Sequence, residues 1–441
     1  MDFRCTLFGP AALIVALAGC PTSDAPAEPT WHQDVAPIVV GSCAGCHRAG
    51  GVGPFALQTY EDAAPIAGWL AGVTESGQMP PWGVTDDGCG SLRPLHEDPS
   101  LSEAQIQTLR NWADTGAALG DPATAAPLPS GPDWSLTEPT RRLEPDEPYV
   151  VRGDEDDFRC VVLDPELASP VWLTGMEVVP DATEVVHHAL VWVDSDGASA
   201  DLADETGGYP CFGGSGFDGG KLVGGWVPGA GALEYPEGSG LEIAAGSRFV
   251  VQYHYFGNGT DTPDASALDL RWVEAEPARK VTMALRGNAG SAAGGLQLQP
   301  GELAPEFVVP AGAEAHKETI RVPLPGLPNL GLFLVGPHMH LAGVSMKVSV
   351  ERPGGVRQCL LEADAYDFYW QRLYRYDTPI EDLPILSGAD TLILECTYDN
   401  TLDNGRIRDA LSDEGLAAPV DLSLGDSSLE EMCLAVLGVV R

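Results

Sequence analysis

The chain has 441 residues and a formal charge of −40, with 24 lysines and arginines against 64 aspartates and glutamates. This length indicates about three domains rather than one, and the negative charge excludes nucleic acid and anionic membrane surfaces as partners because both would be repelled. The 52 glycines and 37 prolines, together with many short Val, Leu and Tyr runs, favour β-sandwiches for most of the chain.

The N-terminal residues have the features of an export signal. An apolar run over 10–18 is too short to span a bilayer and ends in Leu-Ala-Gly-Cys20. That order resembles a bacterial lipobox, which predicts a signal peptide over 1–19, a lipid anchor on Cys20 and a polar tether over 20–30. An ordinary secretory signal with an incidental cysteine is the alternative. The lipobox predicts a lipid-anchored protein of the bacterial cell envelope, periplasm-facing or on the outer surface. Either signal leads to an oxidising compartment, where disulfides can form.

Residues 31–120 are predicted to form a small all-α domain. Its clearest helix opens near Leu101, because Ser102 and Gln105 match a capping box and apolar residues then recur at helical spacing. Residues 121–148, rich in proline, alanine and charge, are predicted to be a linker.

Cys43-Ala-Gly-Cys46-His47 within this domain is the C-x-x-C-H pattern of covalent haem c attachment. The two thiols can form thioethers with the haem vinyl groups, while His47 supplies the proximal ligand. Met79, on a proline-stiffened loop downstream, is the predicted sixth ligand. This placement is typical of class I cytochromes c. A redox C-x-x-C is the alternative, but the adjacent histidine and the missing βαβ pattern count against it.

From residue 149 onward the pattern changes to short β runs separated by glycine, proline and aspartate clusters. A segment rich in glycine, alanine and serine over 287–301 divides this part, which predicts two β domains over 149–290 and 291–441.

Five of the nine histidines fall in three short motifs of the β region. His338 and His340 form H-x-H, and residues two apart on a strand share a face, so both can bind one metal ion. His254 lies in an alternating strand pattern. His187 and His188 are adjacent, and on a regular strand they would point in opposite directions. Both can bind one ion only if the backbone turns there or each uses a different ring nitrogen.

The ordered set of a His pair, a strand His, H-x-H and a late Met432-Cys433 resembles the copper type II, ascorbate-dependent monooxygenases, which include dopamine β-monooxygenase and the peptidylglycine α-hydroxylating enzyme. The resemblance covers about 149–441. It implies two tandem all-β, jelly-roll-like sandwiches, each with one copper ion, and an activity that inserts an oxygen atom from O2 into an aliphatic C–H bond.

The resemblance also implies the ligands. His187, His188 and His254 would hold the copper that stores and passes an electron, and His338, His340 and Met432 would hold the catalytic copper that binds O2. Three imidazoles suit both copper oxidation states, whereas a thioether favours Cu(I).

The same mapping implies two disulfides, Cys396–Cys433 and Cys160–Cys211. Cys89 and Cys359 have no assigned partner, and a bridge between them is left as one possibility.

Substrate contacts are expected to differ from those of the peptide-processing members. Their substrate-anchoring Arg, Asn and Tyr correspond to Gly336, Leu434 and Val436, none of which forms a charge-assisted hydrogen bond, so peptide amidation is not expected. Trp370 and Gln371 could line the cleft, but we expect an aromatic strand core there.

The sequence therefore predicts a copper monooxygenase of a small substrate, supplied with electrons from a donor through the fused haem. The alternative is a non-catalytic electron-transfer or copper-binding envelope lipoprotein, although a storage protein would be expected to carry denser Met, Cys or His tracts.

Overall fold

The computed structural model describes residues 28–441, apart from 50, 52, 85–88, 90–93, 130–133, 154–155, 212–213, 289–294, 300–303, 426 and 428. The predicted signal peptide over 1–19, Cys20 and most of the tether over 20–30 lie outside these residues. None of the described helices is both long enough and apolar enough to cross a membrane.

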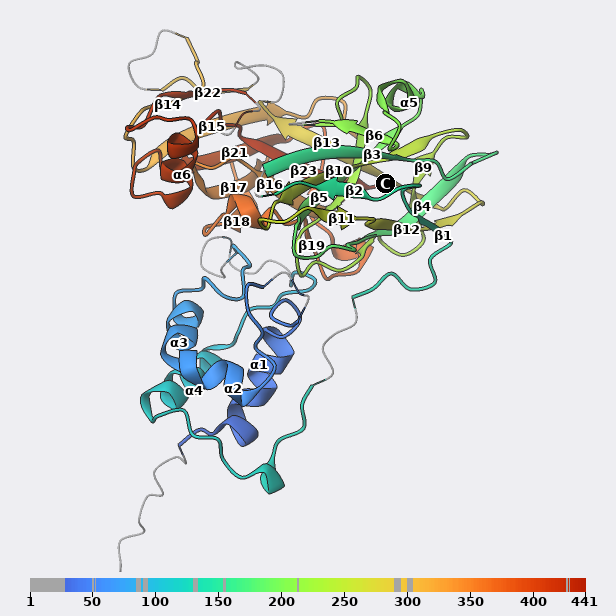
Figure 1. Cartoon of the computed structure of the whole chain (residues 1–441). Helices are drawn as coiled ribbons and strands as arrows, with labels where there is room; N and C mark the ends of the chain where they lie inside the picture. The colour runs from blue at the N-terminus through green and yellow to red at the C-terminus, as the bar shows by residue number, and fades with distance from the viewer. Residues whose placement is uncertain are drawn as a thin grey trace, which may run out of the picture.

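The helical lobe lies apart from the sheets, below them in Figure 1. Its own core contains Trp31, Val39, Leu109 and Trp112. The capping box predicted at Ser102 is confirmed, since its hydroxyl and the Gln105 side chain bond each other's backbone N–H groups. The helices of the lobe are α1 (Ala36–Ser42), α2 (Tyr60–Ala63), α3 (Ala67–Glu75) and α4 (Glu103–Asp114).

The rest of the described chain is almost entirely β, which confirms the β-rich class predicted from composition. A five-stranded antiparallel sheet has the order β6-β3-β10-β5-β7. The strands of this first half, with one short helix, are β1 (Arg141–Leu143), β2 (Tyr149–Val151), β3 (Asp156–Leu163), β4 (Val171–Val179), β5 (Val186–Asp194), α5 (Ala198–Leu202), β6 (Gly208–Pro210), β7 (Lys221–Trp226), β8 (Leu233–Glu234), β9 (Ser239–Ile243), β10 (Arg248–Phe256), β11 (Thr262–Asp264) and β12 (Ala267–Val273).

A ten-stranded sheet runs through both halves in the order β1-β12-β4-β9-β13-β23-β16-β19. Its two remaining strands lie off this path, where β8 pairs with β4 and β20 pairs with β16. A four-stranded sheet, β15-β21-β17-β18, packs with it. The elements of the second half are β13 (Arg279–Gly287), β14 (Val308–Val309), β15 (His316–Pro323), β16 (Leu330–His338), β17 (Gly343–Glu351), β18 (Arg357–Ala363), β19 (Tyr374–Arg375), β20 (Ile385–Leu386), β21 (Thr391–Tyr398), α6 (Gly405–Asp413), β22 (Leu422–Ser423) and β23 (Leu434–Val440).

Two pairings bear on the organisation of the chain. Strand β13 pairs with β23 of the second half and, in parallel, with β9 of the first half, so one sheet continues across both. Strand β1 lies inside the predicted linker over 121–148 and pairs with β12. These pairings do not test the predicted limits of the linker over 121–148 and of the β domains over 149–290 and 291–441, which stay predictions.

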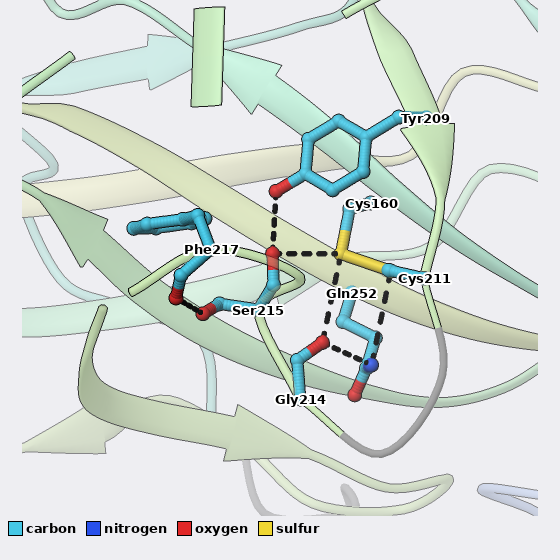
Figure 2. Close-up of a disulfide and its surroundings, with 7 residues drawn as sticks. All are labelled: Cys160, Tyr209, Cys211, Gly214, Ser215, Phe217 and Gln252. Atoms are coloured by element: carbon cyan, nitrogen blue, oxygen red, sulfur yellow. Dashed lines mark hydrogen bonds between the residues drawn. A yellow bond between two sulfur atoms is a disulfide. The ribbon is translucent and has the colours of Figure 1, made fainter. Parts of the chain in front are cut away.

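Three disulfides cross-link the described chain. The predicted Cys160–Cys211 and Cys396–Cys433 bridges are both present, and Cys89 is bonded to Cys359. Figure 2 shows the Cys160–Cys211 bridge beside Gln252, whose Nε2 donates to the Gly214 carbonyl oxygen at 2.6 Å. The bridge therefore lies on the face of the five-stranded sheet that carries Gln252 of β10.

Candidate functional site

A β-bulge brings three histidines of the five-stranded sheet together. His254 on β10 lies opposite His188 on β5, but the next residue, Tyr255, lies opposite Val186, so His187 is the extra residue of a bulge. The backbone turn that the adjacent pair requires is therefore present. Nδ1 of His188 lies 3.0 Å from Nδ1 of His187 and 3.4 Å from Nδ1 of His254.

This three-histidine cluster is suited to a metal ion. One ring nitrogen of each histidine lies within 4.8 Å of the others. Burial, and then the neighbouring His254, lowers the pKa of His187 to about 3, and the same two causes hold the pKa of His188 well below its usual value. Since imidazole binds metals only in its neutral form, burial keeps these two rings in the form that can act as ligands at neutral pH.

A second group forms where β16 ends and β23 begins. His338 is the last residue of β16 and pairs with Leu434, the first residue of β23, so Met432 lies beside the H-x-H motif. His340 lies beyond the end of β16, not on a regular strand as predicted, yet the His338 and His340 ring centroids are 5.3 Å apart. His338, His340 and Met432 all line the same cavity, described below.

Hydrogen bonds orient both imidazoles of this second group. Nδ1 of His338 lies 2.5 Å from Oε1 of Gln371, and Nδ1 of His340 lies 2.9 Å from the Glu430 carbonyl oxygen. Both partners are acceptors, so each Nδ1 carries the proton of its ring. Metal-binding histidines in proteins are held in this way.

Glu431 is a residue of this site that the sequence analysis missed. It is buried, and its carboxylate accepts backbone N–H groups of His340 at 2.8 Å, Ala342 at 2.7 Å and Met432 at 3.2 Å. Burial raises its pKa to about 7. Glu431 thereby joins the H-x-H turn to the Met432 segment. A lone glutamate between two loops has no periodic pattern that would have revealed it.

Both groups face one cavity of about 350 Å³. This cavity, called here the shared cavity, lies within the size range of small-molecule sites. Phe368 lies between the groups, with its ring 6.4 Å from that of His188 and 6.1 Å from that of His340. The lining includes Gly336, Leu434 and Val436, the three positions considered in the sequence analysis for substrate contacts. Its other apolar residues include Leu190, Trp226, Leu285, Pro337, Phe368 and Leu373.

The C-x-x-C-H motif lines a second cavity of about 650 Å³, called here the motif cavity, together with Met79. Cys43 and Cys46 are not disulfide-bonded, and burial raises the pKa of the Cys43 thiol to about 11. Nδ1 of His47 donates to the Phe55 carbonyl oxygen at 3.1 Å, which leaves its Nε2 available as a ligand. The room, the unbridged thiols and the orientation of His47 fit a covalently attached haem.

The expectation that Trp370 and Gln371 belong to an aromatic strand core was wrong. Phe368–Trp370 forms a short helical turn instead of a strand, because Asp367 caps it by accepting the Tyr369 N–H. Gln371 consequently bonds His338 in the shared cavity, and Trp370 lines the motif cavity.

No family model matches the chain. A curated relative, DBH-like monooxygenase protein 1 of Gallus gallus, is 28% identical over 275 residues, which cover 58% of this chain. The chain spans only 39% of the length of that relative. Solved structures with some similarity include the major capsid protein P2 of bacteriophage PM2 (TM-score 0.29, 10% identity, 68% of this chain and 96% of that one) and Paenibacillus xanthan lyase (TM-score 0.15, 10% identity, 74% and 29%). At such TM-scores these structures carry no argument.

Proposed function

We propose that this chain is a copper-dependent monooxygenase that hydroxylates an aliphatic C–H bond of a small substrate with O2. The observation that carries the proposal is the shared cavity, which is lined by His188 and His254 of one candidate copper site and by His338, His340 and Met432 of the other. The sequence similarity to a DBH-like monooxygenase supports the same activity.

The two ligand groups would give their copper ions different properties, because their ligand types differ. His187, His188 and His254 would hold a copper ion through nitrogen alone, while Met432 adds a soft sulfur ligand to His338 and His340. Copper supplies one-electron redox chemistry and, in its reduced form, an open position for O2. Residues around the second group keep its ligands together, since Glu431 joins the two ligand-bearing loops and the Tyr398 hydroxyl donates to the Met432 carbonyl oxygen at 2.7 Å.

The lining of the shared cavity limits the substrate class. Most residues that line this cavity are apolar, and Leu434 and Val436 offer no charged contact. Its charged lining residues are Arg372, Arg406, Asp409, Asp413 and Glu414. A small, largely apolar molecule is favoured, because a free carboxylate would find no bidentate cation at the positions that bind it in the peptide-processing enzymes.

We further propose that residues 31–120 form a cytochrome c-like domain, with haem c attached to Cys43 and Cys46 and held by His47 and Met79. Haem with imidazole and thioether ligands supplies electron transfer at a raised potential. The partners would then be the substrate, O2 and a one-electron donor. Export and a lipid anchor on Cys20 would place the protein in the bacterial cell envelope.

The test is metal analysis combined with product analysis. The haem- and copper-loaded protein is supplied with a chemical reductant, ¹⁸O2 and a panel of small molecules that carry benzylic or allylic C–H bonds. We expect two coppers per haem, reductant-dependent oxygen uptake and one labelled oxygen atom in an alcohol product. Copper chelation should abolish the oxygen uptake and the product but leave the haem spectrum unchanged. Tightly bound copper that is reduced and reoxidised without any labelled product would favour the alternative of an electron-transfer or copper-binding lipoprotein.

A further inference from the structure

The three histidines of the first cluster are divided between the two cavities. His187 lines the motif cavity, together with Cys43, Cys46, His47 and Met79. His188 and His254 line the shared cavity instead. His187 is the extra residue of the bulge, and its ring both joins the cluster and reaches the motif cavity.

Neighbouring residues of the segment 368–372 line one cavity or the other. Tyr369 packs edge-on against His187, with ring centroids 5.2 Å apart, while Trp370 lines the motif cavity. Arg372 lines both cavities and is buried. A Cβ atom on Gly229 would lie 3.1 Å from Sγ of Cys46 and 3.4 Å from Nη2 of Arg372, so the β-sheet part of the chain touches the C-x-x-C-H motif directly.

The loop that follows Met79 fixes the helical lobe in this position. Trp82 is buried in the core of the β sheets, and the Arg372 guanidinium lies 5.4 Å from the centre of its ring. Further along the loop, Cys89 is covalently bonded to Cys359, and Leu95 forms a β-bridge with Tyr376. A covalent link and a buried aromatic anchor hold the segment that follows Met79 against the β sheets.

We infer that His187 is the residue through which electrons from the haem reach the copper module, and that the three-histidine copper is the first acceptor. This inference rests on the proposed haem and copper ligands. In each transfer one electron leaves iron(II), which becomes iron(III), and reduces copper(II) to copper(I). The external one-electron donor then restores iron(II).

Flash photolysis of the anaerobic, fully oxidised holoprotein tests the inference. A photoreductant reduces the haem within the flash, and haem absorbance follows its reoxidation. We expect a first-order phase whose rate does not change when the protein is diluted ten-fold. Two matched variants separate the acceptors: His340→Ala, which lacks the second copper, keeps the phase within about two-fold, and His254→Ala, which lacks the first copper, loses it.

The reasoning is overturned if the phase persists in His254→Ala, if it disappears in His340→Ala, or if the rate in the unmodified protein falls on dilution. Rapid freeze-quench EPR of the unmodified protein gives a second readout, the order in which the two copper(II) signals disappear. The copper(II) signal that disappears first must be the one that a Met432→Leu substitution leaves unchanged, and the opposite order contradicts the inference. A protein that shows the phase but forms no hydroxylated product would refute the proposed function and leave this inference standing.

Discussion

Replacing Glu431 by glutamine tests how the second ligand group is held together. Its Oε2 accepts the N–H groups of His340 and Met432, and its Oε1 accepts that of Ala342. A glutamine side chain keeps only one oxygen, so at least one buried backbone N–H loses its partner. A hydrogen bond to a charged group contributes about 1.5–3 kcal/mol. We therefore expect the free energy of unfolding to fall by about that amount.

Copper content should fall together with the free energy of unfolding, because Glu431 holds the H-x-H turn against the Met432 segment. In the Glu431→Gln variant we expect about one copper per chain instead of two, with the haem spectrum unchanged. Glu318→Gln is the matched control. Glu318 is equally buried and bonds His316 at 2.8 Å, and among the hydrogen bonds of the described residues it accepts no backbone N–H of a proposed copper ligand. The control should lose stability but keep both coppers. Equal copper content in the two variants would refute the reasoning.

Three further changes give separate tests. Met432→Leu should stop oxygen uptake and leave the haem absorption spectrum unchanged, and surviving turnover would place O2 chemistry elsewhere. The double variant Cys89→Ser/Cys359→Ser opens a covalent loop with a sequence separation of 270, so denaturant unfolding should show a loss of about 2–5 kcal/mol, and no loss would contradict the anchoring role of this bridge. Arg159 donates to Asp204 at 2.6 Å and lowers the pKa of that carboxyl below its ordinary 3.8. A depressed carboxyl pKa stabilises the fold above about pH 4 and ceases to do so as the pH falls through the folded-state pKa, so Asp204→Asn should lower the Tm at pH 7 but not at strongly acidic pH. An equal Tm difference at both pH values would show that the ion pair is not the cause.

Local sequence patterns predicted those parts of the fold that depend on residues close together in the sequence. The capping box at Ser102 depends on three residues, and the strand pattern around His254 depends on alternation, so both were predicted directly. The Cys160–Cys211 and Cys396–Cys433 pairings came from the family resemblance rather than from the spacing of the cysteines. The structure contains both bridges.

Other features depend on contacts between distant segments and left no local pattern. A bulge is set by the register of β5 against β10, so the sequence left open how His187 and His188 could bind one ion. The Phe368–Trp370 turn contains consecutive aromatic residues, which strands also favour, and only its contacts show that it lies between the two cavities. Glu431 has no local pattern either, because its place in the site depends on backbone N–H donors from two segments that are distant in sequence.

Crystallography of the copper-loaded protein at the copper absorption edge tests the central claim most directly. The account predicts two anomalous peaks, one among His187, His188 and His254 and the other among His338, His340 and Met432. A single peak, or peaks outside these two groups, would contradict it.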